Sequence, residues 1–346
     1  MAAPATERAT MTAVVRDRYG PPDVLDLQEV ERPELADDSV LVRVRASSVN
    51  RADWYDVSGT PWIARPMTGL RGPKCRLNGR DFAGTVEAVG KDVTDLQAGD
   101  DVFGGKGGGG SFAEYVCVPT GVARKPANLT FEEAAAVPLA ALTALQGLRD
   151  HGQLQRGHKV LVNGASGGVG TFAVQIAKAL GAEVTAVCST RNVEQARSLG
   201  ADHVIDYTGE DFTRSGRRYD VILDVAGSKS WSQCRRVLNP HATLVIVGGK
   251  GSRLMGPLGH IAKVRLAALR GPQKAVFFVA NFNGPDLSIL RELLESGKLR
   301  PVVEKRYDLG EVADALLYMG AGHAQGKIVI TLPGEDLPSP AGRAPA

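Results

Sequence analysis

A run of small residues, GASGGVG at residues 164–170, is the feature that most constrains what this chain can fold into. An apolar strand pattern at residues 159–163 precedes it, a helical pattern at 169–180 follows it, and a second strand pattern occupies 183–188. A strand, a tight turn of small residues, a helix and another strand in this order are typical of a unit that binds a dinucleotide.

The three key positions of such a turn are held by Ala165, Gly167 and Gly170. A residue without a side chain at Gly167 lets the backbone approach a pyrophosphate, and one at Gly170 lets the helix pack on the strand. The helix N-terminus then offers free N–H groups to the phosphates. We therefore predict that the dinucleotide contacts the turn through Ala165, Ser166, Gly167, Gly168, Val169 and Gly170.

Two different patterns divide the chain. Up to about residue 130, short strand patterns alternate with Gly- and Pro-rich turns, which is typical of a compact β-barrel-like domain. From there on strands and helices alternate, and the strands are almost continuously apolar, as expected for a doubly wound parallel sheet covered on both faces. The last strand of that series is expected at residues 275–279. The fold class is therefore α/β with two domains.

The composition excludes several function classes. The 346 residues carry a net charge of only +3, which is too weak to indicate nucleic acid or an anionic membrane as the partner. No apolar run approaches the ~20 residues of a membrane-spanning helix. Four cysteines without a Cys-x-x-Cys pair fit a reducing compartment, and we predict a cytoplasmic location. The alternative is that the Ala- and Thr-rich residues 1–10 target an organelle.

The residues after the second strand of the dinucleotide unit indicate which dinucleotide is bound. An NAD-binding unit usually has an acid there, which accepts a hydrogen bond from the ribose 2′-OH. This chain has Ser189, Thr190 and Arg191, and no carboxylate occurs before Glu194. Hydroxyls and a guanidinium suit a 2′-phosphate, so we predict NADPH as the cofactor. The alternative is that Arg191 only caps the loop.

The chain as a whole resembles the medium-chain dehydrogenase/reductase superfamily, in its zinc-independent, quinone oxidoreductase-like branch. Besides the glycine turn, the resemblance is carried by SVNRADW (48–54), GRDFAGTVEAVG (79–90), GDDVFG (99–104), SFAEYVCVP (111–119), AAAVPLAALTALQGL (134–148) and GKIVIT (326–331). It implies a GroES-like β-barrel catalytic domain, residues 1–134 completed by 282–346, and a Rossmann NADP-binding domain, residues 135–281. It also implies possible homodimers through an edge strand near residues 277–282.

Zinc-dependent members of that superfamily carry an early Cys and a His-Glu pair, and a catalytic zinc needs three such protein ligands. Here the Cys position falls within residues 49–51, and the His-Glu position holds Arg80 and Asp81. We therefore predict no metal. Without a Lewis acid, alcohol oxidation is disfavoured, and hydride delivery to a conjugated C=C bond or a quinone is favoured.

The resemblance implies a substrate cleft near Asn50, Asp53 and Tyr55, in a loop of the catalytic domain. Asn50 would hold the substrate carbonyl or the nicotinamide ribose. For Asp53, a functional role and a purely structural role both stay open. Tyr55 would donate a proton or a hydrogen bond to the substrate oxygen, or would only pack on the barrel. The basic segment 62–76 would cover the cleft or be a solvated loop.

On the cofactor side, the resemblance implies a further set of contacts. These are Thr143, near the nicotinamide and phosphates; Tyr207, near the 2′-phosphate; Ala226, Val247, Gly248 and Gly249, at the ends of sheet strands; and Phe278 and Val279, along the nicotinamide. For Phe278, a place in the core is the alternative.

The leading hypothesis is an NADPH-dependent reductase of a small electrophilic substrate, a quinone or an α,β-unsaturated carbonyl compound. An enoyl-thioester reductase is a second hypothesis, weakened because Thr60, Pro61 and Trp62 replace the Tyr that such enzymes carry after the position of Gly59. The third is a protein that binds NADPH without catalysing a reaction.

Overall fold

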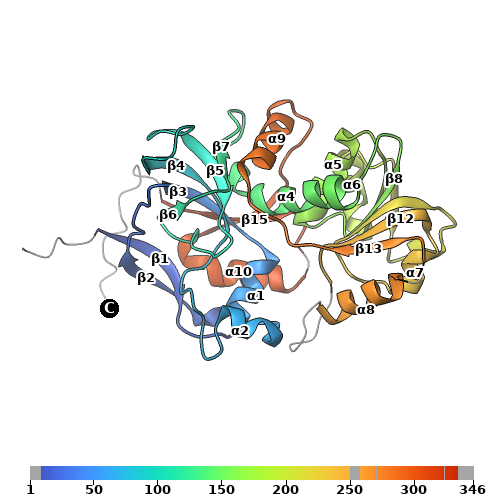
Figure 1. The fold of residues 1–346 in the computed structure, drawn as a ribbon, viewed down its shortest axis with the longest axis horizontal. Helices are drawn as coiled ribbons and strands as arrows, with labels where there is room; N and C mark the ends of the chain where they lie inside the picture. The colour runs from blue at the N-terminus through green and yellow to red at the C-terminus, as the bar shows by residue number, and fades with distance from the viewer. Residues whose placement is uncertain (1–8, 250–257, 270, 323, 334–346) are drawn as a thin grey trace, which may run out of the picture.

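The computed structural model describes residues 9–249, 258–269, 271–322 and 324–333. Two sheets organise them, with a β-hairpin at one side (Figure 1). The helices are α1 (Arg51–Ser58), α2 (Arg65–Thr68), α3 (Phe131–Ala135), α4 (Pro138–Gln146), α5 (Gly168–Ala179), α6 (Val193–Ser198), α7 (Trp231–Arg235), α8 (Leu258–Ala268), α9 (Gly284–Glu295) and α10 (Val312–Gly320).

The six-stranded sheet is parallel throughout, and its strands run in the order β10-β9-β8-β11-β12-β13. Numbered along the chain from β8, this is the order 3-2-1-4-5-6 of a dinucleotide-binding fold. The strands are β8 (Lys159–Asn163), β9 (Glu183–Cys188), β10 (His203–Asp206), β11 (Tyr219–Asp224), β12 (Leu238–Ile246) and β13 (Lys274–Phe277). The predicted doubly wound parallel sheet is confirmed. Strand β13, however, ends two residues earlier than predicted.

Alternate residues of β8 belong to different core clusters because the sheet is covered on both faces. Val160 and Val162 pack in a cluster that includes residues of α4 and α5, while Leu161 packs in another with residues of α7 and α8. Figure 1 shows α5 and α6 on one side of the sheet and α7 and α8 on the other. This two-sided burial is why the sequence pattern is continuously apolar rather than alternating.

The second sheet has the order β14-β15-β3-β4-β5-β7, and β6 pairs with β3 beside it. Its strands are β3 (Val40–Val49), β4 (Asp81–Val89), β5 (Asp101–Gly105), β6 (Tyr115–Val118), β7 (Val122–Arg124), β14 (Val303–Asp308) and β15 (Lys327–Thr331), and β1 (Thr10–Arg16) and β2 (Leu25–Glu31) form the hairpin. Strands β14 and β15 therefore return from the end of the chain to complete the domain that begins it. The boundaries at 134/135 and 281/282 stay a prediction.

One element of the catalytic domain differs from prediction. Residues 51–58, expected in a loop, form helix α1. Asn50 is its N-cap, and Asp53 at the third helical position accepts a hydrogen bond from the Asn50 N–H at 2.7 Å. This reciprocal capping satisfies backbone groups that are otherwise unpaired at a helix start. Gly59, with φ of 62°, ends the helix in the left-handed conformation that glycine favours.

Candidate functional site

The glycine turn connects β8 to α5 as predicted. A Cβ atom at Gly170 would overlap the backbone carbonyl oxygen of Gly164, so this glycine is needed for the helix to pack on the turn. A Cβ atom at Gly167 would make only an ordinary van der Waals contact, with the Gly164 carbonyl oxygen 3.8 Å away. Helix α5 starts without a capping side chain and without an acid in its first turn. Its N–H groups and positive dipole end can therefore meet an anion there.

Ser189, Thr190 and Arg191 follow β9 directly, next to the end of β10. The structure brings Asp206, which was not predicted, to this place: the Thr190 hydroxyl donates to its carboxylate at 2.6 Å. Hydrogen bonds from Thr190 and Thr208 lower the pKa of the Asp206 carboxyl, which is therefore ionised at neutral pH. An acid therefore does lie near the predicted 2′-phosphate site. It comes from the end of the neighbouring strand β10 and not from the loop after β9. Arg191 and Tyr207 are both exposed beside it.

The ends of β8 and β11 are joined by a buried pair at the point where the strand order reverses. The Asn163 side chain donates to the Asp224 carboxylate at 2.7 Å, and burial raises the pKa of that carboxyl. The Asp224 oxygen also accepts from the N–H of Gly227, which shapes the turn that contains Ala226. Val247, Gly248 and Gly249 follow β12 alongside this turn, since a Cβ atom at Gly227 would overlap Gly249. These residues do gather at the carboxyl edge of the sheet, where ligands bind in such folds.

The two residues predicted along the nicotinamide have different surroundings. Phe278 stacks on the His151 ring with centroids 4.3 Å apart and packs against the core, which favours the alternative interpretation. Val279 is 80% exposed. Both lie beyond the end of β13, and Gln146 holds the following segment through two hydrogen bonds to the Asn281 backbone.

Thr143 lies on α4 and is mostly buried, with its hydroxyl donating to the Leu139 carbonyl oxygen. The start of this helix is attached to the other domain: the N–H of Leu139 donates to the Asp81 carboxylate of β4 at 2.9 Å. The position of Thr143 is therefore linked to the catalytic sheet.

A buried polar cluster, Asn50, Asp81 and Lys327, occupies the place where the sequence predicts the cleft. The Lys327 ammonium donates to Asn50 Oδ1 at 2.6 Å and to the Val49 carbonyl oxygen at 3.1 Å, and it lies 3.4 Å from Asp81 Oδ2. The Asn50 amide donates to the same Asp81 oxygen at 2.9 Å. Burial lowers the pKa of Lys327, and its side chain also contacts the glycine turn, since a Cβ at Gly168 would lie 2.9 Å from its Cδ.

Both polar ends of the Asn50 amide are thus engaged inside the protein. The structure favours neither of the two predicted contacts, to the substrate carbonyl or to the ribose. Sequence reasoning did not identify Lys327 or Asp81 as site residues, although both lie in motifs that carried the resemblance. A lysine at the first position of a strand is usually exposed, whereas Lys327 is 3% exposed.

Asp53, three residues after Asn50, is fully buried and forms an ion pair with Arg80. Burial raises the pKa of Asp53 to about 7, against the lowering effect of Arg80. Its Oδ1 atom is 3.8 Å from Arg80 Nε and has no hydrogen-bond partner among the described residues. Arg80 itself is held by Asp56 at 2.5 Å. Asp53 therefore takes part in the capping of α1, and its predicted role in the cleft stays a prediction.

Tyr55 lies on α1 rather than in a loop, and it is half-buried. Within the described residues its hydroxyl makes no hydrogen bond, so it is available to a ligand. The segment after α1, which contains α2, has exposed side chains at Trp62, Ile63, Met67 and Leu70.

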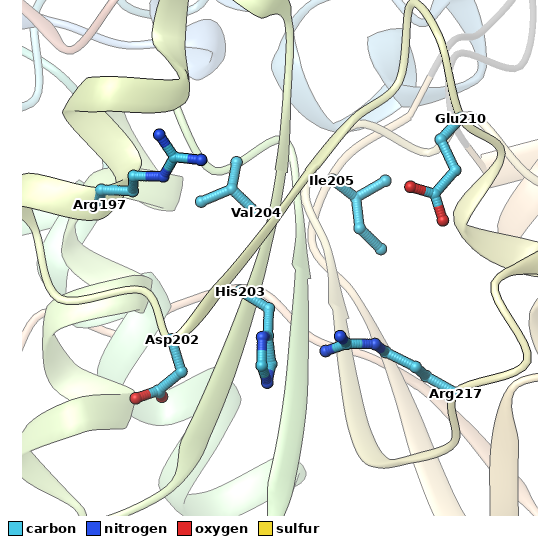
Figure 2. Close-up of a pocket in the computed structure, with 7 residues that line it drawn as sticks. All are labelled: Arg197, Asp202, His203, Val204, Ile205, Glu210 and Arg217. Atoms are coloured by element: carbon cyan, nitrogen blue, oxygen red, sulfur yellow. The ribbon is translucent and has the colours of Figure 1, made fainter.

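A separate pocket lies along the edge strand β10. It has a volume of about 280 Å³ and is lined by Arg197, Asp202, His203, Val204, Ile205, Glu210 and Arg217. Figure 2 shows the Arg217 guanidinium pointing toward the His203 ring. The lining follows β10 from His203 to Ile205 and includes Glu210 beyond its end, so this pocket lies along an outer edge of the sheet. No residue of the glycine turn lines it. We do not assign the dinucleotide to it.

Comparison with known proteins places these features in a family. Two family models match the chain: "Alcohol dehydrogenase GroES-like domain" over residues 36–127, and "Zinc-binding dehydrogenase" over residues 199–330. No group of His, Cys, Asp or Glu that could hold a metal ion occurs among the residues that the structure describes. No helix in that part of the chain is long and apolar enough to cross a membrane.

The mouse mitochondrial NAD(P)H oxidoreductase RTN4IP1 is 37% identical, with 93% of this chain and 89% of the relative covered. The tomato 2-methylene-furan-3-one reductase is 35% identical, over 90% of this chain and 76% of the relative. The solved structure of the quinone oxidoreductase from Coxiella burnetii superposes with a TM-score of 0.84 at 31% identity, covering 94% of this chain and 100% of that one. With its GroES-like and Rossmann domains, the chain therefore belongs to the quinone oxidoreductase-like branch of the medium-chain dehydrogenase/reductase superfamily, and is a nicotinamide-dependent oxidoreductase.

Proposed function

We propose that this protein is an NADPH-dependent oxidoreductase that reduces a quinone or the C=C bond of an α,β-unsaturated carbonyl compound without zinc. The observation that carries the cofactor choice is the end of β9, where Ser189, Thr190 and Arg191 are in the place of an acid. The names of the relatives support the substrate class, since they include a quinone oxidoreductase and a furanone reductase.

The residues present fit the dinucleotide. The free space at Gly167 and the uncapped start of α5 would hold the pyrophosphate, and the loop after β9 would hold the 2′-phosphate. When bound, the reduced nicotinamide supplies the hydride. The Tyr55 hydroxyl would then donate the proton, or a hydrogen bond, to the substrate oxygen on which negative charge develops. Hydride and proton together complete a two-electron reduction.

The buried cluster supports a zinc-independent reaction. The Lys327 ammonium occupies the space between Asn50 and Asp81, at the positions where zinc-dependent relatives carry ligands. A buried ammonium that is already bonded to these groups would repel a metal cation. A conjugated acceptor does not need the metal, because its own carbonyl group takes up the charge. A cytoplasmic location and a homodimer through the sheet edge near residues 277–282 are further parts of this proposal.

The test is a fluorescence titration of NADPH and NADH with the wild type and Arg191→Glu, followed by NADPH oxidation with a set of quinones and enones. We expect tight NADPH binding that Arg191→Glu weakens, unchanged NADH binding, and turnover with at least one acceptor. Equal affinity for both dinucleotides, unaltered by the substitution, would contradict the phosphate site. Binding without turnover of any acceptor would favour a non-catalytic NADPH-binding protein.

A further inference from the structure

Charge is strongly segregated along this chain. Residues 57–80 contain five Lys or Arg and no Asp or Glu, and residues 225–285 contain nine and again no acid. These two segments carry +14 in a chain whose net charge is +3, so the remainder carries −11. The net charge is small because acids elsewhere in the chain offset two strongly basic segments.

The two segments also expose apolar side chains. In the α2 lobe, which we define as residues 60–76, Met67 is 81% and Leu70 is 71% exposed. On the α8 face, which we define as Lys263, Arg265, Leu266 and Leu269, the two leucines are 69% and 79% exposed. Single exposed apolar residues are ordinary, but a group of them mixed with cations indicates an interaction surface.

The cations beside these apolar side chains are available to a partner. Arg71 and Lys74 in the α2 lobe and Lys263 and Arg265 on the α8 face are all exposed. No ion pair of these four residues occurs among the described parts of the chain. Arg65, by contrast, is engaged with the rings of Tyr19 and Trp62 and keeps the lobe in shape.

The α2 lobe and the α8 face lie along the same edge of the molecule. Figure 1 shows α2 and α8 apart from each other but both on the lower side of the molecule, one from each domain, while α9 lies on the upper side. An extended surface that approaches the molecule from this side would meet both. We call the two together the basic edge.

We propose that the basic edge binds the surface of an anionic lipid membrane. Such a surface offers negative charge to the lysines and arginines, and an apolar layer directly beneath it for Trp62, Ile63, Met67, Leu70, Leu266 and Leu269. A nucleic acid would satisfy the cations but leaves the aliphatic side chains in water. A second copy of this chain would place the same basic surface against itself, because two-fold contacts are isologous, and like charges would repel. This inference does not depend on the proposed function.

The experiment is co-sedimentation of the full-length protein with vesicles of phosphatidylcholine alone and of phosphatidylcholine with phosphatidylserine, at low and high salt. We expect binding only to the anionic vesicles, and release at high salt because screening weakens the attraction. Arg71→Glu/Lys74→Glu should lower the partition coefficient at least ~tenfold, and Leu70→Asp/Leu266→Asp should lower it similarly. Lys298→Glu and Ile289→Asp, exposed on or just after α9, are the matched controls and should leave it unchanged.

Melting temperatures equal to the wild type would show that the variants are folded. The proposal is overturned if the wild type binds neither vesicle, if the basic-edge variants bind as the wild type does, or if the controls lose binding equally. Binding of single-stranded RNA but not vesicles, or a dimer that the basic-edge variants dissociate, would also overturn it and identify the alternative partner. Because sedimentation needs no turnover, its failure is distinguishable from failure of the proposed function.

Discussion

Lys327 Nζ lies 2.6 Å from Asn50 Oδ1, so the last strand of the catalytic sheet is bonded to the N-cap of the helix that carries Tyr55. Through Asp81 the same cluster reaches the first residues of α4 in the other domain. The buried Asp81 carboxylate therefore accepts hydrogen bonds from residues of both domains. We therefore expect substitutions in this cluster to lower the free energy of unfolding.

Lys327→Met is expected to lower the free energy of unfolding by about 3–5 kcal/mol, because it leaves the Asp81 carboxylate buried without its cation. The measurement is urea unfolding, and Lys298→Met is the control at an exposed lysine. The double variant Lys327→Met/Asp81→Asn should be more stable than the sum of the single effects predicts. Additive losses would mean that the two side chains are not energetically coupled.

Asp53 predicts a pH dependence of stability. Its folded-state pKa of about 7 lies above the unfolded value near 4, so the folded state favours the protonated form. The unfavourable contribution of Asp53 to the free energy of unfolding is therefore absent below about pH 4 and grows as the pH rises to about 7. Asp53→Asn keeps a capping oxygen, and its stability relative to wild type should rise by up to about 4 kcal/mol between pH 4 and 7. Unfolding at several pH values checks this, with Asp92→Asn, at an exposed position, as the control.

Gly167→Ala and Gly170→Ala distinguish a glycine that makes room for the dinucleotide from a glycine that lets α5 pack on the turn. At Gly170 the new methyl overlaps the Gly164 carbonyl oxygen, so we expect a large loss of thermal stability. At Gly167 nothing of the protein is closer than 3.8 Å, so stability should be kept while NADPH affinity falls at least ~tenfold. Thermal unfolding and dinucleotide titration give the two readouts. Unchanged affinity in Gly167→Ala would move the pyrophosphate away from this turn.

Asp206→Asn tests the acid that the structure places beside the proposed 2′-phosphate site. Removing this negative charge should tighten NADPH binding about threefold and leave NADH binding nearly unchanged. Thr190→Val serves as the comparison, because it removes the hydroxyl that donates to the Asp206 carboxylate and leaves that charge in place. Tighter NADH binding in Asp206→Asn, with NADPH unaffected, would place the 2′-phosphate elsewhere.

Tyr55→Phe should lower kcat at least ~tenfold with any acceptor that turns over, because the only hydroxyl removed is the proposed proton donor. NADPH affinity should stay the same. Initial rates over a range of pH give the readout, and Tyr307→Phe, on β14 and outside the predicted site, is the control for loss of a hydroxyl. An unchanged kcat would assign the proton to solvent and Tyr55 to packing.

The parts of the fold that follow from local rules were predictable. The glycine turn and the six parallel strands have patterns that span only a few residues each, and the strand order then follows from the fold class. Helix α1 was not predicted, because Asn50 and Asp53 were interpreted through their resemblance to a cleft motif rather than as the two ends of a capping box. That signal was present in the sequence.

The site depends more on contacts between distant residues. The hydrogen bond between Thr190 and Asp206 joins the ends of neighbouring parallel strands, and strand adjacency alone could have suggested it. The burial of Lys327 could not be inferred in this way. It depends on β15 entering the sheet next to β3 and on Asp81 being accessible from that side, which are properties of the assembled domain.

The return of β14 and β15 to the first sheet has a consequence for biosynthesis. Asp81 leaves the ribosome 246 residues before Lys327, and the Rossmann sheet is made entirely between them. The domain that is begun first must therefore be finished last. Until β15 is made, strand β3 lacks its neighbour and the Asp81 carboxylate of β4 lacks the Lys327 ammonium. Chaperone capture of nascent chains should be concentrated in that interval.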